Sequence, residues 1–150
     1  METLEYILET KARGNGGVLT TRPDATAVEA VDEMCRAHVG ALLVTRGAEV
    51  VGIVTERDIM TRLVLERRDP AKTRVRHIMT PQVVSVRTDV EPEQAMSIMT
   101  ARRCRHLPVV GDDGRVVGML SIGDLVRWAS QHHEMEIREL SEYVCGKYPG

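Results

Sequence analysis

The chain has 150 residues, which suffices for one domain of ordinary size or two small repeated units and excludes a large multidomain enzyme. It carries 20 Lys+Arg and 22 Asp+Glu, and this net charge of −2 argues against a protein that coats nucleic acid. Aromatic residues are scarce and Phe is absent, so we expect an aliphatic core. No apolar run approaches the roughly 20 residues that a membrane helix needs.

The compartment is predicted from the chain start and the cysteines. The first residues are acidic, where a secretory signal would be basic and then apolar, so we expect a cytoplasmic protein. Cys35, Cys104 and Cys145 are odd in number and form no C-x-x-C pair. This spacing predicts neither a disulfide framework nor a zinc site, and we interpret the cysteines as reduced thiols.

An internal repeat organises the chain after a predicted N-terminal helix over residues 1–13. An offset of about 65 residues aligns the two halves. The offset becomes 66 after one insertion in the turn 111–114, and it then aligns Gly52 with Gly118 and Asp58 with Asp124. Insertions are tolerated in hairpin turns, so this position supports a true duplication.

Each repeat is predicted to run strand, helix, strand, strand, helix, which makes the fold class mixed α/β. In the first repeat, residues 14–67, we expect these elements at 17–21, 27–38, 41–45, 50–55 and 56–66. After a linker over 68–76, the second repeat, residues 77–130, places them at 83–86, from Pro92, at 107–110, at 116–121 and from Ile122. Residues 131–150 form a predicted helical tail, whose apolar stripe is typical of intrachain core or a dimer seam.

Both repeats end their third strand with the pattern G-h-h-[T/S]-x-x-D, at residues 52–58 and 118–124. Ser or Thr followed three residues later by an acid is a capping box and requires no ligand. The same pattern also supplies the parts of a nucleotide site: a glycine that admits a flat group, free N–H groups at a helix N-terminus, and a carboxylate for ribose hydroxyls. Both interpretations stay open at the level of the residues.

The duplicated motif, together with the run Arg105-His106-Leu107-Pro108-Val109-Val110, resembles tandem cystathionine β-synthase (CBS) domains, the CBS pair or Bateman module. The resemblance covers about residues 14 to 130. It implies a pseudo-twofold packing of two repeats, with clefts that bind an adenosine-containing ligand such as AMP, ATP or NAD. It also implies a homodimer and a freestanding regulatory protein.

The resemblance implies a role for individual residues. Asp58 and Asp124 would bind ribose, Thr55 and Ser121 would bind ribose or phosphate, and Arg105 with His106 would meet phosphate. The other nucleotide-binding residues that it implies are Thr20, Gly40, Ala41, Ile53, Arg57, Val84, Val86 and Met119. Repeat 1 has Gly40 and Ala41 where repeat 2 has Arg105 and His106, so we expect the two clefts to be unequal.

Other side-chain clusters are interpreted as structural. The cations around Arg105 fit a solvated face or a phosphate cradle better than a nucleic-acid patch. The pair His132-His133 with Glu136 has a helical spacing that could serve a metal, but a third ligand is missing, so we interpret the histidines as surface residues. Cys104 is predicted to be a buried, inert thiol. The spacing of the residues predicts no Ser-His-Asp or Cys-His catalytic arrangement.

The function predicted from the sequence is a ligand-sensing regulatory module in signal transduction. The protein is not expected to be an enzyme, to use a catalytic cofactor or metal, or to bind nucleic acid or membranes. Its expected partners are an adenine nucleotide, a second copy of the same chain and an unknown regulated protein. The alternatives are a structural or interaction module whose capping boxes are only caps, and a small nucleotide-processing enzyme.

Overall fold

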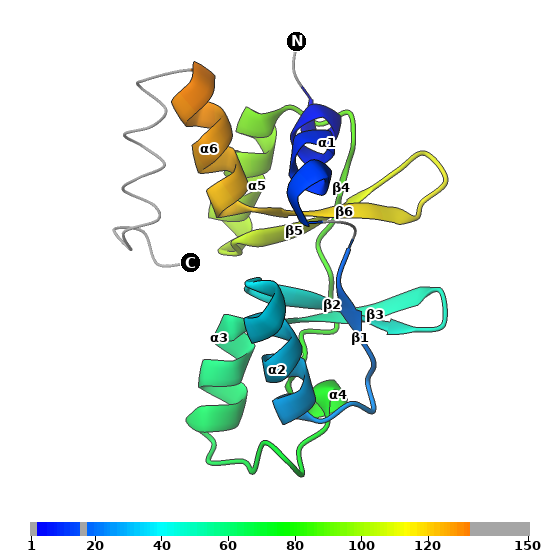
Figure 1. The fold of residues 1–150 in the computed structure, drawn as a ribbon, viewed down its shortest axis with the longest axis vertical. Coiled ribbons are helices and arrows are strands. Elements are labelled where there is room, and N and C mark those ends of the chain that lie inside the picture. The colour runs from blue at the N-terminus through cyan, green and yellow to red at the C-terminus, as the bar shows by residue number, and fades with distance from the viewer. Residues whose placement is uncertain (1–2, 16–17, 133–150) are drawn as a thin grey trace. The chain divides into compact units, whose positions relative to one another are not determined.

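The structure is a computed structural model that describes residues 3–15 and 18–132 (Figure 1). It contains two compact units. Residues 18–83 form the first unit, and residues 3–15 with 84–132 form the second unit. The predicted mixed α/β class is confirmed, because each unit holds a three-stranded sheet with helices against it.

The first unit is built on the sheet order β1-β2-β3. Strand β1 (Thr20–Thr21) pairs in parallel with β2 (Ala41–Arg46), which forms an antiparallel hairpin with β3 (Glu49–Thr55). The helices of this unit are α2 (Ala27–Ala37), α3 (Glu56–Asp58), the π-helix η1 (Ile59–Val64) and α4 (Val75–Ile78).

The second unit repeats this sheet as β4-β5-β6. Strand β4 (Val86–Arg87) is parallel to β5 (His106–Val110), and β5 is antiparallel to β6 (Val116–Ser121). Its helices are α1 (Leu4–Asn15), α5 (Pro92–Arg102) and α6 (Ile122–His132). Each hairpin contains a register shift, after Val44 and after Val109, so the duplication extends to the irregularities of the sheet.

Local side-chain chemistry fixes the helix ends. The Thr26–Glu29 capping box predicted for α2 is present, and its hydrogen bonds from Thr26 hold the pKa of Glu29 below its ordinary value. Pro92 occupies the first turn of α5, where its missing N–H costs nothing. Helices α2 and α5 both end at a residue in the left-handed region, His38 (φ 56°) and Arg103 (φ 53°).

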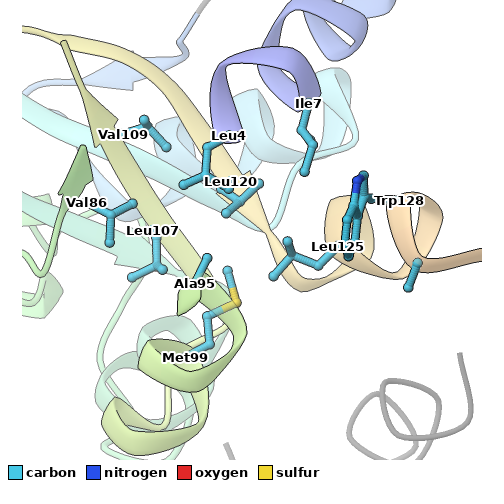
Figure 2. Packing of buried hydrophobic residues seen from close by; sticks show 11 residues of the cluster. Leu4, Ile7, Val86, Ala95, Met99, Leu107, Val109, Leu120, Leu125 and Trp128 are labelled. Atoms are coloured by element: carbon cyan, nitrogen blue, oxygen red, sulfur yellow. The ribbon is translucent and has the colours of Figure 1, made fainter. Parts of the chain in front are cut away.

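Helix α1 belongs to the hydrophobic core of the second unit. Leu4 is fully buried and Ile7 is buried, and both contact the cluster that includes Leu120, Leu125 and Trp128 (Figure 2). The N–H of Leu4 also donates to the carbonyl of Val90 at 3.2 Å. The first helix of the chain therefore completes the second repeat.

The motif glycines lie where packing leaves no room for a side chain. A Cβ on Gly118 would meet Leu8 Cδ2 of α1 at 2.6 Å. A Cβ on Gly52 would lie 2.7 Å from Met79 Sδ and 2.9 Å from the backbone oxygen of Thr80. The backbone oxygen of Thr80 therefore restricts residue 52 to glycine, whereas at residue 118 the side chain of Leu8 would have to shift.

The observed elements differ from the sequence prediction at the first helix, which spans Leu4–Asn15 instead of 1–13, and in the following respects. The first strand of each repeat is shorter than predicted, because only two residues of each pair with the neighbouring strand. The predicted helix 56–66 becomes π-helical from Ile59. There the N–H of Leu65 donates to the carbonyl of Met60, and the Thr61 hydroxyl donates to the carbonyl of Arg57. The end of the predicted linker contains helix α4.

Candidate functional site

Asp58 is a buried carboxylate, only 6% exposed, and it is the third residue of α3, which begins at Glu56. Its Oδ2 accepts hydrogen bonds from Thr55 N (3.0 Å) and Thr55 Oγ1 (3.2 Å), while its own N–H donates to Thr55 Oγ1 at 3.3 Å. These contacts form a complete capping box at the strand-to-helix junction. The capping box that the sequence predicts at this motif is therefore confirmed in the first repeat.

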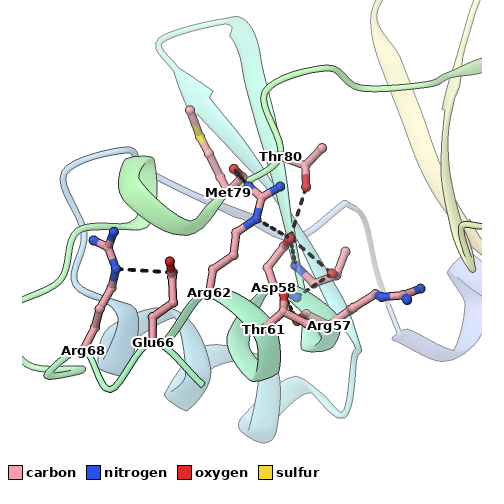
Figure 3. Close-up of polar contacts among 9 residues, drawn as sticks. Arg57, Asp58, Thr61, Arg62, Glu66, Arg68, Met79 and Thr80 are labelled. Atoms are coloured by element: carbon pink, nitrogen blue, oxygen red, sulfur yellow. Dashed lines mark hydrogen bonds and ion pairs between the residues drawn. The ribbon is translucent and has the colours of Figure 1, made fainter. Parts of the chain in front are cut away.

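The second oxygen of Asp58 faces other parts of the first unit (Figure 3). Thr80 Oγ1 donates to Oδ1 at 3.1 Å, and Arg62 Nε lies 3.8 Å from the same oxygen. Arg62 Nη1 also donates to the carbonyl oxygen of Met79 at 2.6 Å. Asp58 thus joins the helix that it caps to the segment that follows α4.

Asp124 occupies the corresponding position in the second repeat and is 3% exposed. Its Oδ2 accepts from Ser121 N at 2.8 Å, and its N–H donates to Ser121 Oγ at 3.2 Å. Its Oδ1 pairs with Arg127 of the same helix, whose side chain is 69% exposed. The two repeats therefore keep the cap but surround the carboxylate with different partners.

Backbone pairing brings the other motif neighbours to the same end of each sheet. Ala41 pairs with Thr55, and the Gly40 carbonyl accepts from Glu56 N at 3.0 Å. In the second unit His106 pairs with Ser121, and the Arg105 carbonyl accepts from Ile122 N at 2.9 Å. The backbones of Arg105 and His106 therefore lie beside the Asp124 motif within one unit.

The remaining predicted site residues are distributed over the sheets. In the first unit Thr20 is exposed on β1, Ile53 is buried in β3, and Arg57 is exposed on α3. In the second unit Val84 precedes β4, Val86 is buried in β4, and Met119 is partly buried in β6.

Sequence analysis missed three residues that contact the carboxylates: Arg62, Thr80 and Arg127. Arg62 is four residues after Asp58 and Arg127 is three after Asp124, spacings that place side chains together on a helix and could have identified them. Thr80 is separated from Asp58 by 22 residues, and no local pattern connects the two.

The family model of the CBS domain matches residues 15–65 and 75–131. The chain belongs to the CBS-domain family. The tandem repeat predicted from the sequence is therefore a pair of CBS domains.

Relatives and solved structures agree with this membership. The CBS pair is 35% identical to the mitochondrial CBS domain-containing protein CBSX3 of Arabidopsis thaliana, over 97% of this chain and 73% of that protein. A protein with CBS domains from Burkholderia ambifaria MC40-6 is 37% identical with a TM-score of 0.83, covering 89% of this chain and 97% of that one. CBSX2, solved in complex with AMP, is 26% identical with a TM-score of 0.62, covering 76% and 88%.

The predictions about metal ligands, the C-terminal tail and membrane helices concern other parts of the CBS pair. Among residues 3–15 and 18–132, no group of His, Cys, Asp and Glu could hold a metal ion. His133, Glu136, Cys145 and the apolar stripe of the predicted tail lie outside the described residues. In the described part of the chain no helix has the length and apolarity needed to cross a membrane.

The thiols of Cys35 and Cys104 are expected to react at different rates. Cys35 is exposed, whereas Cys104 is partly buried, and this burial raises the pKa of the Cys104 thiol despite the opposing charge of Arg102. Because the thiolate is the nucleophile, Cys104 should be alkylated more slowly at neutral pH, and faster as the pH rises. Iodoacetamide labelling of a Cys145→Ser protein, followed by peptide mass spectrometry, measures both rates. Equal rates in the folded protein would contradict this expectation.

Proposed function

We propose that this CBS pair is a regulatory sensor of adenine nucleotides that changes the activity of a partner protein. The supporting observation is the duplicated buried acid, Asp58 and Asp124, each at a helix N-terminus beside a strand end. Such a carboxylate can accept ribose hydroxyls while the helix start favours phosphate. The likeness to CBSX2, which was solved with AMP, supports AMP as the first nucleotide to test, ahead of ATP and NAD.

The competing function is a structural module without a ligand. The reciprocal capping bonds of Asp58 and Asp124 favour it, because they give both carboxylates a local role. We assign the protein no catalytic step, so turnover of a bound nucleotide would contradict the proposal. A cytoplasmic location stays a sequence prediction, since the Arabidopsis relative is named as mitochondrial.

AMP is expected to raise the melting temperature of the protein, because a ligand of the native state adds about 2.7 kcal/mol at a hundredfold excess over Kd. The Asp58→Asn/Asp124→Asn double variant should bind AMP at least about tenfold more weakly, since hydrogen bonds to charged groups contribute about 1.5–3 kcal/mol each. Thermal shift and calorimetry measure the two effects.

The matched control for this variant is Asp32→Asn/Asp113→Asn, which removes two exposed acids and makes the same change in charge. It should bind AMP like the parent, and uridine monophosphate should shift neither protein. If the Asp58→Asn/Asp124→Asn variant binds AMP as tightly as the parent, the carboxylates are caps alone.

We further propose that the sensor is a homodimer. Met60, Val64 and Leu65 form an exposed apolar patch on and just after η1, with 60%, 64% and 75% of each residue accessible. Apolar side chains gathered in this way favour a partner surface, and a second copy supplies the same patch.

Light scattering at low micromolar concentration should give twice the monomer mass for the parent protein. Met60→Lys/Val64→Lys should give a monomer, because two desolvated charges oppose the contact. Val117→Lys changes a comparably exposed apolar residue on β6 and should leave the dimer intact. A monomeric parent, with and without AMP, would exclude the dimer.

A further inference from the structure

The segment at residues 79–80 is the last part of the first unit that is hydrogen-bonded to its sheet. Thr80 forms an isolated bridge to β3, with Ile53 N to Thr80 O at 2.9 Å and Thr80 N to Ile53 O at 2.8 Å. Residues 81–85, which we call the connector, then lead without regular structure to β4 of the second unit. Whatever holds Thr80 therefore sets where the connector begins.

Side chains add a second attachment at this point. Thr80 Oγ1 donates to Asp58 Oδ1 at 3.1 Å, and Arg62 reaches both the same oxygen and the Met79 carbonyl. The proposed ribose-binding carboxylate and the start of the connector thus share the same contacts. Figure 3 shows Arg62 and Thr80 approaching Asp58 from different elements.

The acceptor capacity of Asp58 is nearly filled by these contacts. A carboxylate offers about four lone-pair sites. Thr55 takes two on Oδ2, Thr80 takes one on Oδ1, and Arg62 lies against that same oxygen. A ribose that presents two neighbouring hydroxyls must therefore displace a donor. Thr80 is the hydrogen-bond donor outside the capping box, and Arg62 is the ion-pair partner of the same oxygen. Their loss leaves the helix start intact.

We propose that Arg62 and Thr80 form a latch that holds the start of the connector on Asp58, and that adenosine bound at Asp58 opens this latch. The inference rests on the proposed function, because it needs a ribose at that carboxylate. An open latch leaves Thr80 held to the sheet by its two backbone hydrogen bonds to Ile53 alone, so the start of the connector is released more readily. Binding of the nucleotide thus changes how the connector is held. The contacts of Asp58 with Thr80 and Arg62 differ between the free and the bound protein, and a ligand can shift a conformational equilibrium only through such a difference.

The latch distinguishes the two repeats. At Asp124 the residue paired with Oδ1 is Arg127, which belongs to the same helix as the carboxylate. A ligand that displaces Arg127 moves an exposed side chain of the helix that carries Asp124. We place the latch at the Asp58 motif because Thr80 reaches that carboxylate from a segment outside the helix.

Hydrogen exchange of the full-length protein tests the latch with three matched proteins. Thr80→Val removes the hydroxyl donor, and Thr80→Ser retains it. Without nucleotide, the amides of Ile53 and Thr80 should exchange about tenfold faster in Thr80→Val than in the parent, because a hydrogen bond to a carboxylate is lost. Thr80→Ser should exchange like the parent.

The second part of the experiment measures the same amide exchange in the presence of AMP. AMP should accelerate exchange at Ile53 and Thr80 in the parent and in Thr80→Ser, and should add little in Thr80→Val. Calorimetry should show several-fold tighter AMP binding to Thr80→Val, since no hydroxyl competes for Oδ1. AMP binding that slows or leaves unchanged this exchange would overturn the latch.

The two proposals fail in different ways. Absence of AMP binding to all three proteins would contradict AMP as the ligand and would remove the ligand-driven opening of the latch. The comparison of Thr80→Val with Thr80→Ser in nucleotide-free protein would still decide whether Thr80 holds the connector. Equal exchange in those two variants would exclude the latch itself.

Discussion

Replacement of Leu4 by alanine is expected to destabilise the second unit by about 2–5 kcal/mol, the range measured when a buried leucine is truncated. Leu4 is fully buried against residues of the second repeat, although it lies more than 80 positions earlier in the chain. Truncation removes apolar contacts and leaves a cavity between α1 and the sheet. Urea unfolding followed by the fluorescence of Trp128, the one tryptophan of the chain, reports on this unit.

The control is Glu5→Ala, which changes the next residue on α1. Glu5 is exposed, and alanine is an excellent helix former, so we expect stability within about 0.5 kcal/mol of the parent. If Leu4→Ala and Glu5→Ala unfold at the same urea concentration, α1 does not contribute to the core of the second unit.

Replacement of Gly52 by alanine is expected to destabilise the first unit by about 1–3 kcal/mol, as overpacking does in a well-packed interior. The new Cβ would lie 2.9 Å from the Thr80 backbone oxygen, which cannot move without disturbing the bridge to Ile53. At Gly118 the nearest atoms belong to the flexible side chain of Leu8, so Gly118→Ala should cost less. Thermal unfolding by far-UV circular dichroism measures both variants.

Gly123→Ala is the matched control for these glycine variants. Gly123 lies in α6, and its Cβ would be 3.6 Å from the nearest atom, Ser121 Oγ. Alanine favours a helix by up to about 1 kcal/mol over glycine, so this variant should be as stable as the parent or more stable. Equal stability of Gly52→Ala and Gly123→Ala would mean that the close approach of residues 79–80 is not rigid.

These glycines also bear on how the motif is interpreted. From sequence, a glycine in the third strand suggested room for a flat ligand. The structure gives each glycine a packing role, against Met79 and Thr80 in one unit and against Leu8 in the other. The nucleotide proposal therefore depends on the carboxylates and the helix starts, and the glycines add no independent support to it.

The sequence by itself determined the features that depend on neighbours a few residues apart. The Thr26–Glu29 and Thr55–Asp58 boxes and the first turn at Pro92 follow from contacts within about four positions. The duplication was equally visible, because two copies of one pattern reinforce each other. These signals were sufficient for the fold class and for the pair of candidate carboxylates.

Only the tertiary structure decided which distant residues pack against these local elements or form hydrogen bonds with them. The sequence predicted an N-terminal helix without a packing partner, and the structure places α1 in the core of the second repeat. The sequence predicted that Asp58 would act as a cap or a ligand, and the structure adds Thr80 from 22 positions later. Such contacts result from how the whole chain packs, and no periodicity or spacing encodes them. The physical reason is that burial and long-range hydrogen bonds depend on the surfaces brought together, whereas caps and turns depend on the residues beside them.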